Sequence, residues 1–325
     1  MNMLHLIEMS ILSGLCFAGL IALLSVPLHK KFKGQLAKLP CRIRARILVV
    51  WLISPLMMGI LFPLSGLLPT LIDQHALSAN HCLSHDNGIA HLCWFNPNLY
   101  NSNPLWSLGI ILLAIGIAFC ASKAFVKLIK SRNFLAALRA ISSPDCTRGV
   151  FHIATNKTFV FSAGLLHPQI FVSTNLIDQL TTKQLDVVLA HERAHCQRRD
   201  VLRRVLLRLV AVLHSPGIGK ALFHDVELAH EQICDEAAAK AVDDRLCVAE
   251  TIVKMERCMR VQIPSQTADV IAFNGSHIEA RIQVLLEAPE PVSRRMLFFS
   301  SAFWVASFSG MLALSMPLHH LSLLF

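Results

Sequence analysis

Long apolar runs alternate with polar, strongly basic stretches along the chain. Four of the runs are apolar enough to cross a bilayer, which takes about 20 residues, and they cover residues 7–28, 47–72, 105–129 and 296–317. The second run contains three prolines, so we expect a kinked helix there. The pattern predicts an α-helical membrane protein with four transmembrane helices.

The composition agrees with this pattern. Hydrophobic residues make up 54% of the 325 residues and charged residues only 16%, and the mean hydropathy is +0.53. A soluble domain carries about 25% charged residues, so a purely soluble enzyme and a disordered chain are both excluded. Ten cysteines are too few for a secreted disulfide scaffold.

The positive charges predict how the spans are oriented. All 30 Lys and Arg residues lie within 29–46 or 123–295, and such residues mark cytoplasmic loops. We therefore expect the N-terminus and 73–104 outside, and 29–46 and 130–295 inside, at a bacterial cytoplasmic membrane. The net charge of +9 follows this topology, so no nucleic-acid partner is expected. The alternative is that the second run is a buried helix of a soluble domain.

Three parts follow from these spans. Residues 1–129 form a three-span membrane domain with an outer loop at 73–104, residues 130–295 a cytoplasmic domain, and residues 296–325 the fourth span with a short outer tail. The outer loop contains several histidines with Cys82 and Cys93. It is interpreted as a disulfide-closed loop, a metal sensor or a plain polar connector.

The cytoplasmic part contains His191-Glu192-Arg193-Ala194-His195, an H-E-x-x-H motif, within a predicted helix at 181–200. Thr181 and Gln184 have the spacing of a capping box at the start of that helix. Positions i and i+4 share a helix face, so His191 and His195 can bind one Zn²⁺, while Glu192 is placed to act as the general base. The competing interpretation is two surface histidines on an amphipathic helix.

A catalytic zinc needs a third protein ligand. Glu231, on a predicted helix at about 221–242, is the best candidate. Asp235 follows one turn later and is predicted to accept a hydrogen bond from a ligand histidine. His224 and His230 compete with Glu231 for the ligand role. The nearby thiols of Cys196 and Cys234 are expected to be structural.

Short strands are predicted at 149–155, 158–162 and 169–173, before the motif helix. An edge strand there would bind an extended peptide, although a purely structural hairpin fits equally well. The run at 201–213 is interpreted as a core helix with one solvated edge rather than a helix on the membrane surface.

The stretches 162–172 and 185–200, followed by Glu231-x-x-Cys234-Asp235, resemble the M56 family of membrane metallopeptidases, which includes the β-lactam-sensing antirepressor receptors. The resemblance implies His191, His195 and Glu231 as zinc ligands, Glu192 as catalytic acid/base, and an α+β gluzincin-like cytoplasmic zinc-protease domain. The extracellular penicillin-binding domain of those receptors has no counterpart after the fourth span. Direct β-lactam sensing is therefore not expected.

The expected function is that of a zinc endopeptidase embedded in the lipid bilayer. By resemblance, its protein or peptide substrate is a cytoplasmic repressor-like regulator or the chain itself, with a sensor protein as a possible partner in signal transduction. Two alternatives remain open, an M48-type quality-control protease and a non-catalytic receptor or scaffold that contains zinc.

Overall fold

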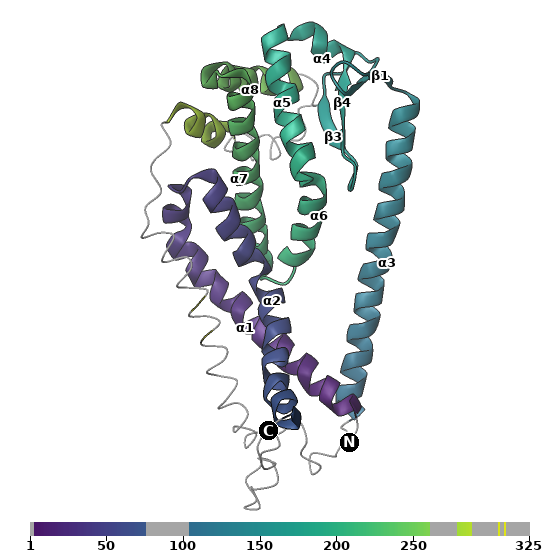
Figure 1. Cartoon of the computed structure of the whole chain (residues 1–325), viewed down its shortest axis with the longest axis vertical. Helices are drawn as coiled ribbons and strands as arrows, with labels where there is room; N and C mark the ends of the chain where they lie inside the picture. The colour runs from purple at the N-terminus through teal and green to yellow at the C-terminus, as the bar shows by residue number, and fades with distance from the viewer. Residues whose placement is uncertain (1–2, 76–103, 261–277, 288–304, 306–308, 310–325) are drawn as a thin grey trace, which may run out of the picture.

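The computed structural model describes residues 3–75, 104–260 and 278–287, together with 305 and 309 (Figure 1). The described chain is mostly helical and has one small mixed sheet. Three long helices, α1 (Met3–Ala37), α2 (Cys41–His75) and α3 (Pro104–Ala140), extend away from the part that carries the sheet.

Helices α1 and α2 pack against each other and are joined by the short turn at 38–40. Two helical segments of the described chain, Gly14–Ala37 and Cys41–Leu61, are long and apolar enough to cross a membrane. They correspond to the first two predicted spans. The third predicted span lies within α3, and its membrane crossing stays a prediction. The fourth span and most of the outer loop lie outside the described residues.

The four strands are β1 (Ser143–Asp145), β2 (Val150–Ile153), β3 (Val160–Ala163) and β4 (Gln169–Ser173), in the order β1-β2-β4-β3. Strands β2 and β4 are parallel and the other two pairs are antiparallel. The three predicted strands are confirmed: β2 is shorter than predicted, β3 begins two residues later and ends one residue later, and β4 has the predicted bounds. Strand β1 is additional. Strand β3 lies at an edge of the sheet.

Five further helices follow the sheet: α4 (Thr174–Gln179), α5 (Thr182–Arg198), α6 (Asp200–Ala211), α7 (Pro216–Val242) and α8 (Arg245–Arg260). The capping box of Thr181 and Gln184 is confirmed at the start of α5. Helix α7 begins five residues before its predicted start. A proline suits this first position, because it has no N–H that would otherwise lack a partner.

Helix α5 is held between two layers. Leu185 and Leu189 pack on the side of β4 and α4, whereas Val187 packs against Ala238 of α7 and Val248 of α8. This burial on opposite sides fixes the rotation of α5, and therefore the direction in which its H-E-x-x-H residues point.

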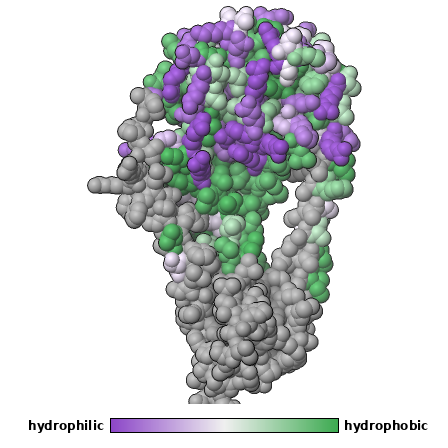
Figure 2. Space-filling model, in the orientation of Figure 1, coloured by the Kyte–Doolittle hydropathy of each residue, from purple (hydrophilic) through white to green (hydrophobic). Residues whose placement is uncertain are grey.

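The prediction of a core helix at 201–213 is wrong. In α6 only Asp200 and Leu207 are buried, whereas Val205, Leu206 and Leu209 are each about half exposed. Figure 2 shows hydrophilic side chains over the part with the sheet and hydrophobic ones below it, toward the long helices. Leu207 packs into a buried cluster with α2 and α7, but the other apolar side chains of α6 are exposed or only partly buried, and periodicity alone could not distinguish the two cases.

Candidate metal centre

The two motif histidines lie one turn apart on α5 and face each other. Their Nε2 atoms are 3.0 Å apart. Helix α5 ends at Arg198, and the residue that follows it, Arg199, adopts the left-handed conformation with φ 54°. Helix α6 therefore starts at the next residue in a new direction, and Asp200, its first residue, reaches back to His195.

Helix α7 brings a third candidate donor, a carboxylate oxygen, to these two nitrogens. Glu231 Oε2 lies 3.5 Å from His191 Nε2, and Glu231 Oε1 lies 3.6 Å from His195 Nε2. All three ligand atoms lie within 4.8 Å of one another. Ligands at tetrahedral angles and about 2.0–2.1 Å from Zn²⁺ would be separated by about 3.4 Å. Two imidazole nitrogens and a carboxylate at these separations fit a zinc ion.

A carboxylate holds the far nitrogen of each imidazole. His191 Nδ1 lies 3.0 Å from Asp235 Oδ1, and His195 Nδ1 lies 2.9 Å from Asp200 Oδ2. Ionised carboxylates only accept hydrogen bonds, so both Nδ1 atoms carry a hydrogen, and a metal would bind through the two Nε2 atoms. Asp235 and Glu231 are one turn apart on α7, which lets one helix supply both groups.

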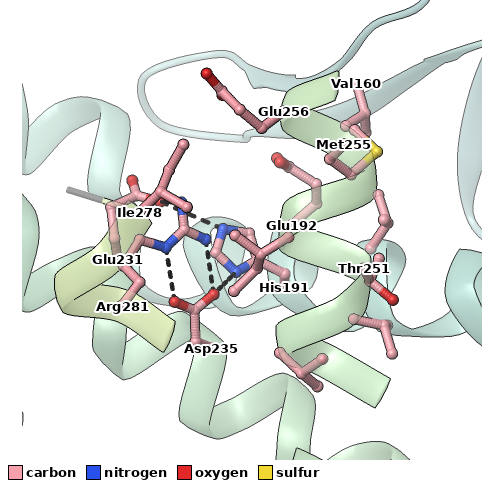
Figure 3. A pocket seen from close by; sticks show the side chains of 14 residues that line it. Val160, His191, Glu192, Glu231, Asp235, Thr251, Met255, Glu256, Ile278 and Arg281 are labelled. Atoms are coloured by element: carbon pink, nitrogen blue, oxygen red, sulfur yellow. Dashed lines mark hydrogen bonds and ion pairs between the residues drawn. The ribbon is translucent and has the colours of Figure 1, made fainter. Parts of the chain in front are cut away.

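Arg281, in the helical segment 278–286, supplies the opposite charge. Its Nε and Nη2 each donate to Asp235 at 2.7 Å, and its Nη1 lies 3.4 Å from Glu231 Oε2 (Figure 3). Asp235 is almost fully buried and Arg281 is 18% exposed. Removing one partner of such a pair would leave an uncompensated charge, so Arg281 fixes the position of both carboxylates.

These contacts set the protonation states. Burial alone would raise the pKa of Glu231, but the hydrogen bond from His191 and the charge of Arg281 hold that pKa well below its usual value. The pKa of Asp235 is lowered against burial mainly by Arg281. Burial alone would lower the pKa of His191, yet its hydrogen bonds to Asp235 and Glu231 raise it to about 10 when no metal is present. A metal ion that binds His191 would therefore displace a proton from it.

Glu192 lies in the cavity beside these groups. The cavity has a volume of about 210 Å³, and its lining includes His191, Glu192 and Glu231. Val160 of β3 and Met255 of α8 form another part of its wall (Figure 3). Glu192 therefore shares a space with the metal-binding atoms without being one of the three converging donors.

The competing candidates are placed differently. His230 lines a separate cavity, and His224 lies beside Asp225 at 3.8 Å. Cys234 is fully buried, with its Sγ 3.4 Å from His195 Nδ1. Burial and the neighbouring carboxylates raise the pKa of this thiol, which leaves it protonated and a poor ligand. Burial also raises the pKa of Cys196, to about 11.

Sequence reasoning missed two residues of the site, Asp200 and Arg281. Asp200 follows His195 by five positions, but its contact depends on the left-handed turn at Arg199. Arg281 lies 46 positions after Asp235, and among 30 basic residues nothing local distinguishes it.

A model of the family described as BlaR1 peptidase M56 matches residues 104–285, which is more than half of the chain. The chain belongs to the M56 peptidase family. No curated protein and no solved structure matches it. Every residue of the candidate metal centre lies inside the matched region, and the match favours M56 over the M48-type alternative. Membership identifies a membrane-associated metallopeptidase and implies a metal, for which the residues above are the candidates.

Proposed function

We propose that this M56 peptidase is a zinc-dependent endopeptidase with its active site on the cytoplasmic side of a bacterial membrane. The convergence of His191, His195 and Glu231 in a cavity that also contains Glu192 carries the proposal. The substrate is a protein, either a repressor-like cytoplasmic regulator or the chain itself.

The roles of the residues follow from their places in the site. Zn²⁺ held by His191, His195 and Glu231 would polarise the scissile carbonyl and make the attacking water more acidic. Glu192 accepts the proton of that water and delivers it to the leaving amine. Asp235 and Asp200 keep the two imidazoles in the tautomer that points Nε2 toward the metal.

The position of strand β3 favours a peptide as the substrate. It is an edge strand, so one side of its backbone has no partner strand within the sheet. Its first residue, Val160, also lines the cavity of Glu192. An extended peptide added to β3 would form backbone hydrogen bonds and place a peptide bond near the metal centre. A polypeptide uses this edge better than a small molecule would.

The test separates metal binding from cleavage. The purified full chain carrying Glu192→Ala is expected to keep one zinc per chain, measured by elemental mass spectrometry. Its cleavage of a peptide library, followed by mass spectrometry, is expected to fall by at least about 10²-fold, because the general base is lost. Glu250→Gln, an exposed change on α8, is the matched control and should leave both unchanged.

Cleavage by Glu192→Ala at the wild-type rate would contradict the proposal. A wild-type chain that holds zinc but cleaves no peptide and does not cleave itself would support the non-catalytic receptor or scaffold instead.

A further inference from the structure

The hairpin of α6 and α7 packs against a candidate membrane span. Leu48, Trp51 and Leu52 of α2 form one buried cluster with residues of the two hairpin helices, which are Leu207, Ile218, Leu222, Phe223 and Val226. His214, in the turn of the hairpin, donates to the carbonyl oxygen of Leu52 at 3.0 Å. Leu52 lies about 16 Å along α2 from Cys41. If Cys41–Leu61 is inside the bilayer, the turn of the hairpin is inside it too.

Exposed apolar side chains near the turn of the hairpin are consistent with a position inside the bilayer. Leu206 and Leu209 are each 52% exposed, and Val212, at the turn, is 79% exposed. Exposed apolar side chains at one end of a hairpin suit a lipid-facing surface, and the exposed Arg208 and Lys220 there have stems long enough to reach its polar boundary.

A large cavity is lined by residues of α2, α5, α6 and α7, and it shares no lining residue with the cavity of Glu192. Its volume is about 710 Å³, which suits a drug-sized or larger ligand. We call it the arginine groove, because its lining includes Arg42, Arg46, Arg198 and Arg203. Among the described residues that line it, none is an aspartate or glutamate.

Both walls of the groove change from charged to apolar in the same direction. On α2, Arg42 and Arg46 are followed by Val49 and Ile53. On α6, Arg203 is followed by Leu206, Leu207 and Val210. The two helices run side by side toward the long-helix end of the protein (Figure 1). The groove therefore has a cationic end and an apolar end.

The four guanidinium groups are only partly compensated. Arg42 lies 3.7 Å from Glu236, while Arg198 and Arg203 share Asp200 at 3.1 and 3.9 Å. Asp200 is also the hydrogen-bond acceptor of His195. Arg46 forms no ion pair with any other described residue. Two carboxylates thus face four cations, and the groove needs further negative charge.

We propose that the arginine groove binds one anionic phospholipid of the leaflet that α2 enters. The phosphate would lie between Arg46 on α2 and Arg203 on α6, where planar guanidinium groups can donate paired hydrogen bonds to it. An acyl chain would follow Val49 and Ile53 toward the bilayer interior. A soluble anion would use the arginines but leave the apolar end of the groove unfilled. The proposal depends on the membrane placement of α2 and not on catalysis.

Thermal unfolding of the full chain in neutral detergent tests the proposal. Dioctanoylphosphatidylglycerol is expected to raise the Tm by about 3–5 °C at concentrations well above its Kd. Dioctanoylphosphatidylcholine, with the same chains and no net charge, should raise it by less than about 1 °C. Inorganic phosphate at the same concentration should also give a shift below about 1 °C, because it cannot fill the apolar end.

Variants then assign the site. Arg46→Gln with Arg203→Gln removes one cation from each wall and should weaken phosphatidylglycerol binding at least about tenfold. Arg257→Gln, an equal change at an exposed position of α8, should retain the full shift. If the double variant does not unfold cooperatively, Arg46→Gln alone is used, and a clearly smaller shift is expected.

Equal shifts with the two lipids would overturn recognition of the headgroup. A full shift with phosphate alone would mean an ion site and overturn the lipid proposal. A double variant, or a folded Arg46→Gln, that binds phosphatidylglycerol as the wild type does would show that the lipid binds elsewhere.

Discussion

The two cavities are lined by different residues of the same two helices, α5 and α7, and they differ in how far their charges are balanced. In the metal cavity, Asp235 and Glu231 both face Arg281, and each imidazole has its own carboxylate. In the arginine groove, four guanidinium groups have two carboxylates between them. The metal site is therefore organised by the chain itself, whereas the groove still lacks negative charge.

Burial explains why the difference matters. The carboxylates of the metal cavity are mostly or almost fully buried, so any unmatched charge there would cost several kcal/mol. Arg203 and Arg42 are half exposed or more, and water can solvate them until a ligand arrives. Pre-arranged charge suits catalysis, and uncompensated surface charge suits recruitment of an anion.

The largest effect is expected when a metal ligand is removed. Glu231→Gln keeps the shape of the side chain but loses the charged oxygen donor. We expect zinc affinity to fall by more than about 100-fold, since ligands matter more than the groups behind them. Competition with a chromophoric chelator measures this change. Unchanged affinity would show that the third ligand is another group.

A lower pH is expected to weaken zinc binding in the metal cavity. Without metal, His191 holds a proton up to pH about 10, so zinc must displace it. The apparent zinc affinity should fall about tenfold for each pH unit below that value, or about 100-fold from pH 8 to pH 6. The same chelator competition at pH 6, 7 and 8 measures the slope. A flat profile would contradict the assignment of that proton.

A smaller loss of zinc affinity is expected when a residue that orients a ligand is changed. Asp235→Asn removes the charge that holds His191 Nδ1–H and should weaken zinc binding by about 10–100-fold. It should also lower the pKa of His191, so that the pH dependence levels off at a lower pH. Asp186→Asn, an exposed change on α5, is the matched control. If both variants bind zinc equally well, Asp235 does not orient the ligand.

The last test concerns the stability of the protein rather than its zinc affinity, and it separates the charge-balancing role of Arg281 from metal binding. Arg281→Gln leaves Asp235 without its guanidinium partner and Glu231 with only that of Arg204, at 3.7 Å, which should destabilise the metal-free protein by about 3 kcal/mol. Zinc supplies positive charge at the same place, so the loss in Tm should be smaller in the loaded protein. Arg281→Lys should recover part of it. Equal losses in Tm with and without zinc would indicate a packing role instead.

Much of the fold could be predicted from local pattern. The first two spans, three strands and the capped helix of H-E-x-x-H follow from apolar runs, β-branched clusters and the Thr181–Gln184 spacing. Helix α6 was misassigned, because its apolar residues have the same periodicity whether they face a protein core or lipid. Whether α6 faces protein or lipid depends on how it packs against α2, and the sequence does not reveal that contact.

The candidate site divides in the same way. The i, i+4 spacing of His191 and His195, and that of Glu231 and Asp235, is a property of each helix, so each pair could be predicted alone. That the two pairs meet depends on how α5 packs against α7. The approach of Arg281 to Asp235 depends on a separate helical segment 46 residues later.

The sequence by itself determined the chemistry that is available, namely two imidazoles and a carboxylate pair on helical faces and an excess of cations near apolar runs. Only the tertiary structure decided which groups share a cavity, that Asp200 and Arg281 complete the metal centre, and that arginines from α2, α5 and α6 meet in one groove. Helical spacing acts over a few residues, whereas these contacts join elements through packing that no single stretch of the chain encodes.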